Sequence, residues 1–376
     1  QRQMCIRDRI GVPYDDLLAQ LNLIGPHFTY DMIRIDVAQF GDIGQTIYRP
    51  LDELSISPEG LSPRLIKNGY DSYSMLNGRV YALPLDPSVQ IFLYRTDLFH
   101  DAKLCRAYYE RFHENLVVPT TYEQYLHAAE FFTRSCNPDS PTEYGTTMTC
   151  GSASVAASDF LPFYLSRIDR FGSTPETLRL DCPEMQAAMR QYHALEKFSC
   201  KQNWWGDSIQ KFAEGKTAMT VIYSNYAAEL INSGNSVVVG RVGAAILPGC
   251  KPLLGGGIVG ISRYSQKAEA CKQFFHWYYS ADVASLLVRL GGTSPIVDAY
   301  EDFQNYSIFP WMNTSKKSFG LGQRGVINQT PERFSIPKYE FAVGTAIRNV
   351  VQDLMTPEDA SRMAQALYDA ADPVCR

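Results

Sequence analysis

The sequence lacks any apolar run long enough to span a bilayer, and it lacks the residue spacings that mark common catalytic and metal sites. Its six histidines form no HExxH or other paired pattern, and there is no P-loop and no G-x-S-x-G turn. The net charge is −5 and the basic residues are dispersed, which argues against nucleic-acid binding. These absences predict a protein without a metal, without a cofactor and without catalysis.

Cysteine occurs nine times, but never in CxxC spacing. An odd, irregular set argues against a disulfide framework and against a zinc ribbon. Such a set is typical of free, mostly buried thiols, and it favours a reducing compartment. Residues 1–9 are polar and basic and have no apolar segment, so they do not form a signal peptide, and we expect them to be a non-native leader.

The length of 376 residues predicts two domains rather than one core. Strand-like segments, such as 32–37, alternate with helical ones along the chain. Thr120 and Glu123 have the spacing of a capping box, and Thr356 followed by Pro357 marks the start of a last helix. This alternation predicts an α/β architecture with mixed, mainly parallel sheets flanked by helices.

The stretch YALPLDPSVQIFLYRTDLF, residues 81–99, is a strand pattern interrupted by two prolines with Asp86 between them. Two interpretations of Asp86 stay open. It caps a turn, or it is a carboxylate at a strand end that accepts hydrogen bonds from ligand hydroxyls. Asp36 ends a separate strand pattern, and a second acid at a strand end favours the ligand interpretation.

Two further features are compatible with a ligand pocket or with ordinary packing. Trp204 and Trp205 are adjacent, so both cannot face one direction, and an outward-facing ring would suit the apolar face of a sugar. The alternative is that both are core anchors. Ser224 and Asn225 lie at a strand-to-helix junction, where they cap the helix or leave its N–H groups for ligand oxygens.

Gly255, Gly257 and Gly260 match G-x-G-x-x-G, the glycine pattern of dinucleotide-binding sites. A strand-like segment follows them where a helix is required, which argues against a nicotinamide-dependent oxidoreductase. We therefore expect Gly255, Gly256 and Gly257 to allow close approach of the backbone to another group.

Taken together, these segments resemble the extracellular solute-binding proteins of the sugar-binding class, which are the receptors of ABC importers. The resemblance follows the family's order from about residue 29 onward. It rests on YDMIRIDVAQF, RPLDEL, NGRVYALPLDPSVQIFLYRTDLF, VPTTYEQYLHAAEFF, FAEGKTAMTVIYSNYA, VGAAILPG, LLGGGIVGISRYSQKAEACKQFFHWYYS, GGTSPIVDAYED and TPEDASRMAQ.

The resemblance implies a periplasmic-binding-protein-like fold, with two discontinuous α/β lobes and a cleft between them. Residues 10–97 and 246–298 would form the first lobe, and residues 98–245 and 299–376 the second. The family normally begins with an additional strand, helix and strand, so the first lobe looks truncated at its N-terminus. The interrupted strand would line the cleft and continue as a hinge through Tyr94.

The resemblance also implies a function: a carbohydrate-binding receptor module that closes around a sugar, with an ABC permease as its partner. We expect it to be a monomer outside the cytoplasm, periplasmic or lipid-anchored. The alternative is a cytoplasmic ligand-sensing domain of a transcriptional regulator that has lost its DNA-binding part. The expected ligand-binding residues are Asp36, Asp86, Gln90 and Asn225 for hydrogen bonds, Trp205 and Tyr223 for stacking, Gly255, Gly256 and Gly257 for backbone approach, Tyr94 at the hinge, and Tyr339 and Glu340 on a helix facing the cleft.

Overall fold

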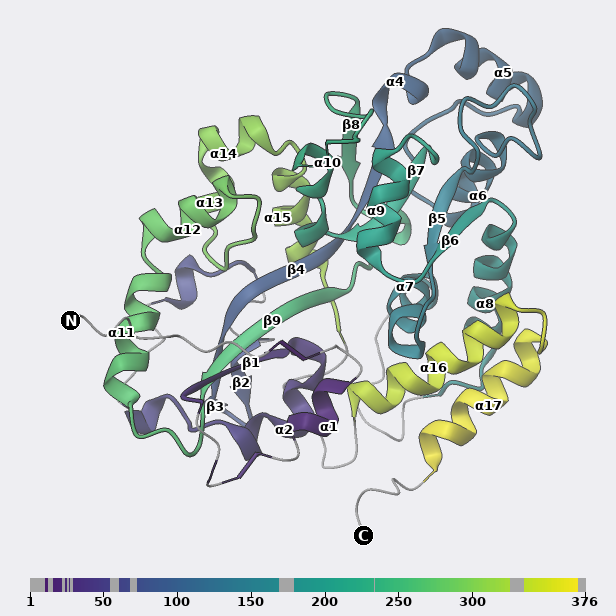
Figure 1. Cartoon of the computed structure of the whole chain (residues 1–376). Helices are drawn as coiled ribbons and strands as arrows, with labels where there is room; N and C mark the ends of the chain where they lie inside the picture. Colours follow the sequence, from purple (N-terminus) through teal and green to yellow (C-terminus); the bar gives the residue numbers. More distant parts are fainter. Residues whose placement is uncertain are drawn as a thin grey trace.

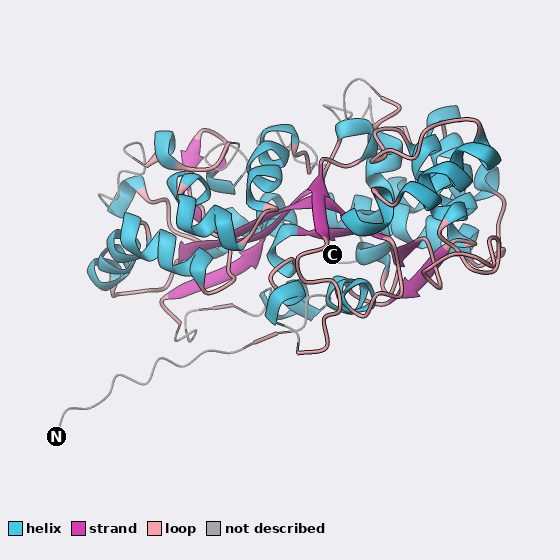
Figure 2. Cartoon of the chain, turned by 90° about the horizontal axis from the view of Figure 1, so that it is seen from above, coloured by secondary structure: helices cyan, strands magenta, loops and turns pink. Residues whose placement is uncertain are grey.

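Two groups of helices lie at the ends of an elongated molecule, and long strands run between them (Figures 1 and 2). The structure is a computed structural model. It describes residues 11–12, 16–21, 24–25, 27, 30–54, 61–67, 73–168, 179–232, 234–324 and 335–370. The leader expected at residues 1–9 lies outside the described residues.

The main sheet has five strands in the order β1–β9–β4–β7, and β8 also pairs with β4. Two smaller sheets pair β2 with β3 and β5 with β6. The strands are β1 (Met32–Asp36), β2 (Met75–Leu76), β3 (Arg79–Val80), β4 (Ala82–Arg95), β5 (Thr146–Thr149), β6 (Ser199–Gln202), β7 (Met219–Tyr223), β8 (Val242–Ala245) and β9 (Leu254–Ile261).

The strands β4 and β9 connect the two ends of the molecule, and we call them the crossing strands (Figure 1). β4 is a single strand of 14 residues, or about 45 Å, so the predicted interruption is only a register shift between Pro84 and Asp86. The predicted mainly parallel pairing must be corrected. Every ladder of the main sheet is antiparallel, and among the described strands only β5 and β6 form a parallel ladder. The chain leaves one end of the molecule along β4 and returns to it along β9. The two neighbouring strands therefore run in opposite directions, whatever helices lie between them in sequence.

Helices cover both ends of the crossing strands. The first group is α1 (Leu17–Leu21), α2 (Phe40–Ile47), α11 (Ala268–Tyr278), α12 (Ala281–Arg289), α13 (Asp298–Glu301), α14 (Phe303–Ile308) and α15 (Met312–Leu321). The second group is α4 (Thr96–Phe99), α5 (Ala102–Phe112), α6 (Tyr122–Phe131), α7 (Ala153–Leu165), α8 (Pro183–Glu196), α9 (Trp205–Ala213), α10 (Glu229–Asn232), α16 (Ile336–Val351) and α17 (Pro357–Asp369). Short 3-10 turns are η2 (Val37–Gln39), η3 (Asp52–Leu54), η4 (Ser62–Arg64), η6 (Ser224–Tyr226) and η7 (Pro248–Cys250).

Local signals explain where several helices begin. The capping box of α6 uses Thr121 and Gln124, one residue later than predicted, because the Thr121 hydroxyl accepts the amide of Gln124. Thr356 caps α17 as predicted, with Pro357 at the first helical position. α16 packs closely on α7, since a Cβ on Gly344 would lie 1.7 Å from the carbonyl oxygen of Ala153.

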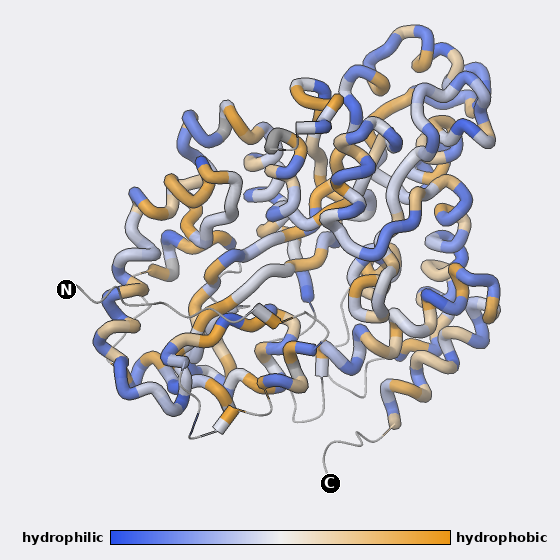
Figure 3. The backbone as a smooth tube through the Cα atoms, in the orientation of Figure 1, coloured by the Kyte–Doolittle hydropathy of each residue, from blue (hydrophilic) through white to orange (hydrophobic). Residues whose placement is uncertain are grey.

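Apolar residues gather on the crossing strands and on the inner faces of the helices, whereas polar residues dominate the outer turns (Figure 3). In the described part of the chain, no helix has both the length and the apolar character that a membrane span requires. The cysteines that the structure describes are free, as predicted, but the prediction that they are mostly buried is wrong for them. Only Cys271 is buried; Cys250 is exposed, and Cys105, Cys136, Cys150, Cys182 and Cys200 are half-buried.

Candidate functional site

Asp36 and Asp86 lie on either side of the same glycine. In the main sheet Asp36 of β1 and Asp86 of β4 both pair with Gly257 of the intervening β9. Asp86 forms a bidentate ion pair with Arg34, in which Nη2 donates to Oδ2 at 2.8 Å and Nε to Oδ1 at 3.2 Å. Asp36 accepts the amide of Ala38 at 2.9 Å and so caps η2. The two acids, 50 residues apart in sequence, therefore flank one glycine. Asp36 ends β1 as predicted, whereas Asp86 lies within β4 and not at a strand end, because β4 continues to Arg95.

The three glycines make room for protein groups. A Cβ on Gly257 would lie 2.1 Å from Arg34 Nε and 2.3 Å from Asp86 Oδ1, so its absence admits that ion pair. A Cβ on Gly255 would lie 2.6 Å from the ring of Tyr223. Gly256 has a φ of +87°, and a Cβ there would lie 2.1 Å from the carbonyl oxygen of Asp86. The close approach expected of the glycines is thus made by side chains and backbone of the chain itself.

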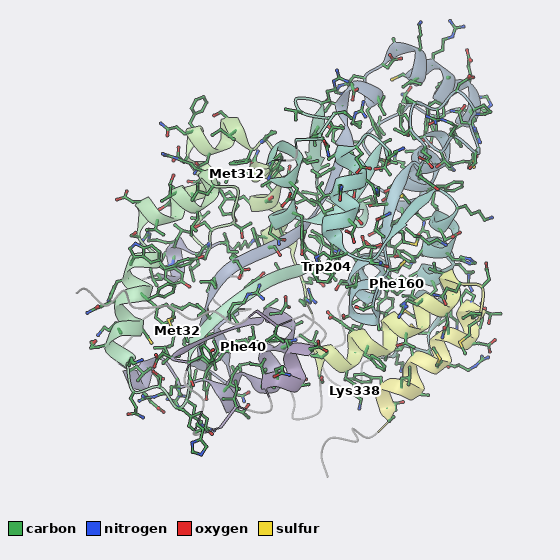
Figure 4. The ribbon with its side chains drawn as sticks, viewed as in Figure 1. Met32, Phe40, Phe160, Trp204, Met312 and Lys338 are labelled. Atoms are coloured by element: carbon green, nitrogen blue, oxygen red, sulfur yellow. The ribbon has the colours of Figure 1, made fainter. Side chains whose placement is uncertain are left out.

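An aromatic row borders this place. The Trp205 ring meets the Tyr223 ring edge-on at 5.0 Å, and Trp204 meets Trp205 at 4.9 Å and Tyr226 at 6.5 Å. Trp205, predicted to stack on a ligand, is only 6% exposed, because the first turn of α9 directs it onto Tyr223. Trp204 precedes the helix and is half-buried near the middle of the molecule, so it is the better platform (Figure 4).

A second ion pair is buried beneath the row. Arg324 Nε lies 2.9 Å from Glu340 Oε1, and Arg324 Nη2 donates to Glu340 Oε2 at 3.1 Å. Arg324 Nη1 also donates to the hydroxyl of Tyr223 at 2.9 Å and to the carbonyl of Leu254 at 3.0 Å. Burial raises the pKa of Glu340, and the Arg324 cation partly offsets that shift. Burial likewise raises the pKa of Tyr223, to about 12.

The carboxylate of Asp36 links these parts electrostatically, because its charge acts on Arg34, Tyr223, Tyr226 and Glu340. We define the acid–aromatic cluster as Arg34, Asp36, Asp86, Trp204, Trp205, Tyr223, Tyr226, Arg324 and Glu340. Its acids, amphipathic rings and donors are the groups that bind polyhydroxylated ligands.

Two buried polar atoms add to this chemistry. Trp205 Nε1 is a donor and Gln39 Oε1 is an acceptor, and neither has a hydrogen-bond partner among the described residues. Buried polar atoms are normally paired, so each is suited to a ligand or a water molecule. In the same described ranges, no group of three or more His, Cys, Asp or Glu side chains is arranged to hold a metal ion.

The family model for bacterial extracellular solute-binding proteins matches residues 11–311. This chain belongs to that family. The predicted family is confirmed, and because its members are extracellular receptors, the match favours the receptor prediction over the cytoplasmic sensor.

Solved structures show which folds this solute-binding protein is similar to. The solute-binding protein of an ABC transporter from Agrobacterium radiobacter K84, in complex with ribitol, has a TM-score of 0.78 and 20% identity, over 94% of this chain and 88% of that chain. The GacH receptor of Streptomyces glaucescens, studied unliganded and with acarbose, has a TM-score of 0.74 and 18% identity, over 96% and 88%. UgpB from Mycobacterium tuberculosis, in complex with glycerophosphocholine, has a TM-score of 0.73 and 17% identity, over 95% and 88%. At these identities the likeness shows the fold. The predicted two-lobe α/β fold class is confirmed, apart from the strand direction in the main sheet.

Several predicted residues of the solute-binding protein lie elsewhere or serve another contact. The side-chain amide of Gln90 donates through Nε2 to the carbonyl of Ser158 at 2.7 Å, and its Oε1 accepts the backbone amide of Leu253 at 2.9 Å. Protein groups therefore already satisfy this side chain. Tyr94 is farther along β4 and packs on Phe99. Tyr339 is buried on α16 against the ring of Tyr368. Asn225 is exposed in η6, beside Tyr226.

A hollow of about 320 Å³, including the open space at its mouth, lies between η6 and the residue before α10 on one side and residues of α12, α13, α15 and their connecting segments on the other. None of the predicted site residues lines it. Its aromatic lining contains no carboxylate, so we place the candidate site at the acid–aromatic cluster, where acids and rings occur together. The lining residues are Ser224, Ala228, Val288, Gly291, Gly292, Thr293, Tyr300, Phe309, Trp311, Met312 and Ser315.

Sequence reasoning missed three contributors to the cluster. Arg34 is two residues before Asp36 on β1, so strand alternation alone would have placed both side chains on one face. Tyr226 belongs to the same junction as Asn225 and could have been considered with it. Arg324 follows α15 in a polar segment, and no local pattern distinguishes it from an exposed arginine.

Proposed function

We propose that this chain is a carbohydrate- or polyol-binding receptor of an ABC importer, and that it closes around its ligand without catalysis. The observation that carries the proposal is that Asp36 and Asp86 lie on either side of one glycine, next to a row of aromatic rings. Acids accept hydrogen bonds from hydroxyls at the edge of a sugar, and a ring covers its apolar face.

The relatives support this ligand class. The solved proteins with similar folds include solute-binding proteins in complex with ribitol, D-mannitol, α-D-tagatose and maltose. In our proposal Asp86 and Arg34 bind hydroxyls at the exposed side of the cluster, Trp204 stacks on the ring or carbon chain, and Asp36 binds a deeper hydroxyl. A permease reads the closed form, and the receptor acts outside the cytoplasm, periplasmic or lipid-anchored.

Two lobes of discontinuous sequence are part of the proposal. The predicted boundary at 298/299 falls inside α13. On the adjoining α14, Asn305 donates to Ser285 at 3.2 Å and to the carbonyl of Ala299 at 2.9 Å. These contacts favour placing α13 and α14 with α12 in the first lobe. Thr314 of α15 donates to the carbonyl of Ala244 on β8 at 3.2 Å, so α15 also contacts the other side. The close packing of Gly344 on Ala153 favours placing α16 with α7 in the second lobe.

Titration with a defined panel tests the function. Ribitol, D-mannitol, α-D-tagatose, maltose and acarbose are added to the protein while tryptophan fluorescence and the melting temperature are followed. A ligand in the cluster changes the emission of Trp204, and it raises the melting temperature by mass action. Absence of any response across the panel would contradict the proposal.

Matched variants locate the ligand. Asp86→Asn removes one acid of the cluster and is expected to abolish the response. Asp52→Asn removes one of the two acidic partners of Arg79, at 3.0 Å, in another exposed ion pair, and is expected to leave the response intact. A response that survives Asp86→Asn but is lost in Trp311→Ala would indicate that the ligand binds in the hollow instead.

A further inference from the structure

Side-chain hydrogen bonds hold the crossing strands at both ends. At the end nearer the first helix group, three tyrosine hydroxyls donate to strand carbonyls. The donors come from α11 and its C-terminal end and from the segment before β2. The bonds are Tyr279 to Pro84 at 2.5 Å, Tyr278 to Leu85 at 2.5 Å and Tyr73 to Gly255 at 2.7 Å, with the Tyr73 hydroxyl also 3.3 Å from the carbonyl of Ser88.

From the next residue onward, the partners from outside the crossing strands come from η6, from α7 of the second group and from the segment after α15. The Ser224 hydroxyl accepts the amide of Val89 at 3.3 Å. The Gln90 amide bridges the carbonyl of Ser158 on α7 and the amide of Leu253. Arg324 donates to the carbonyl of Leu254 while it is paired with Glu340 on α16.

The change of partners occurs at one level of the ladder. Ser88 is opposite Gly255, and Val89 is opposite Leu254. The attachments therefore change between Ser88 and Val89 on β4 and between Leu254 and Gly255 on β9. Next to this level, β4 contains Pro87 and β9 contains Gly256 with its φ of +87°, so the strand geometry is irregular here.

We propose that Arg324 is a positioning residue of this receptor: together with Gln90 it fastens the crossing strands to α7 and α16, so that the lobes pivot between Ser88 and Val89 and between Leu254 and Gly255. This inference rests on the proposed function, because only a receptor that closes needs a pivot. It moves the hinge away from Tyr94, which lies where β4 pairs with β7 and β8.

Burial explains why Arg324 dominates this attachment. The side chains of Arg324 and Glu340 are 4% and 3% exposed, so separating them leaves charges without water. One guanidinium also holds the Tyr223 hydroxyl and the Leu254 carbonyl. Arg324 therefore joins Tyr223, Glu340 and the Leu254 end of β9 into one rigid unit. Bending occurs at the next level of the ladder, between Leu254 and Gly255.

Hydrogen exchange of single amides tests the proposal on the full chain without any ligand. The double variant Arg324→Gln/Glu340→Gln removes both charges, so neither is left buried alone. We expect exchange at Val89, Gln90 and Leu254 to accelerate about ten-fold or more, while Gly257 stays within about two-fold of the parent protein. Small-angle scattering of the same variant should give a larger radius of gyration, since the lobes separate more freely.

The matched control is Arg95→Gln/Asp97→Asn, which removes another bidentate pair, at 2.7 and 2.5 Å, at the far end of β4. A merely structural role of Arg324 would lower the melting temperature and accelerate exchange on both sides of the pivot. The proposal would be overturned by accelerated exchange on both sides of the pivot or by exchange that does not change. It would also be overturned if the control variant gave the same pattern as Arg324→Gln/Glu340→Gln.

A milder variant covers the case in which the double variant does not fold. Tyr223→Phe keeps the ring and both charges but removes one acceptor of Arg324, and it should give the same pattern of exchange with a smaller amplitude. Uniform or unchanged exchange in Tyr223→Phe would contradict the pivot. Because no sugar is added, a failed titration with the carbohydrate panel leaves this outcome unaffected.

Discussion

Two arginine–carboxylate pairs lie against the crossing strands, and water reaches only one of them. The side chains of Arg34 and Asp86 are 40% and 45% exposed, whereas those of Arg324 and Glu340 are 4% and 3% exposed. An exposed pair contributes little to stability and can exchange its partner for a ligand hydroxyl. A buried pair cannot lose one partner without leaving a charge out of water. In the proposed function, the first pair therefore takes part in binding and the second holds the lobes in their arrangement.

The largest expected effect comes from breaking the buried pair on one side only. Arg324→Met leaves Glu340 buried without its cation, and we expect it to lower the free energy of unfolding by about 3–5 kcal/mol at pH 8. Arg324→Met/Glu340→Met should recover most of this loss, because no lone charge remains. Urea unfolding measures both, and a single variant that loses less than about 1 kcal/mol would contradict the assignment.

Arg324→Met should lose less free energy of unfolding at acidic pH than at pH 8. Burial raises the pKa of Glu340, and removing Arg324 removes the cation that offsets the shift. An acid with a raised pKa favours the folded state at low pH, and that stability is lost as the pH rises through the folded pKa. The difference in free energy of unfolding between Arg324→Met and the parent protein should therefore become smaller as the pH is lowered from 8 to 5.

Asp159 on α7 sharpens the comparison, because it is a buried carboxylate bound by neutral donors. The Tyr192 hydroxyl donates to Asp159 Oδ2 at 2.7 Å, and the Thr149 backbone amide donates to the same oxygen at 3.2 Å. Burial nevertheless raises the pKa of Asp159 from 3.8 to about 7. Its stability contribution is complete below the unfolded pKa and is lost as the pH rises through about 7.

We expect this loss to be on the order of 3 kcal/mol between pH 4 and pH 8. Asp159→Asn keeps an acceptor for Tyr192 and removes the titration, so its free energy of unfolding should depend less on pH. Urea unfolding at several pH values measures the difference between the two proteins. Parallel pH profiles would show that Asp159 titrates normally.

The neighbouring glycines predict a smaller and asymmetric effect. Gly256→Ala places a Cβ at positive φ, 2.1 Å from the backbone oxygen of Asp86, and should cost about 1–3 kcal/mol. The atoms nearest to a Cβ on Gly257 belong to the ends of the Arg34 and Asp86 side chains, which can move away, so Gly257→Ala should cost less. Thermal unfolding of the two variants compares them, and equal costs would contradict the difference in local crowding.

The smallest effect on stability is expected at the exposed pair itself. Asp86→Asn should change the free energy of unfolding by less than about 1 kcal/mol, because both side chains remain hydrated. Its cost should appear in the carbohydrate titration instead. A stability loss as large as that of Arg324→Met would erase the distinction between the two pairs.

Part of the site could be predicted because strands impose simple geometry. Asp36 ends a strand pattern and Asp86 interrupts another, and strands that share a neighbour bring their residues to one level. The sequence could not show which of Trp204 and Trp205 is buried, because adjacent rings point apart and only the start of α9 decides which one turns inward. Gln90 was chosen for its chemistry, and the packing of α7 against β4 gave it protein partners instead.

The sequence by itself determined the strand and helix alternation, the caps of single helices and the ordered segments by which the family is recognised, since these depend on neighbours along the chain. The tertiary structure decided strand direction, because the return of β9 beside β4 is a property of the whole path. It also decided the partner of Arg324. Glu340 is 16 residues away and Tyr223 is 101 residues away, and no local pattern relates a charge to groups that only folding brings within reach.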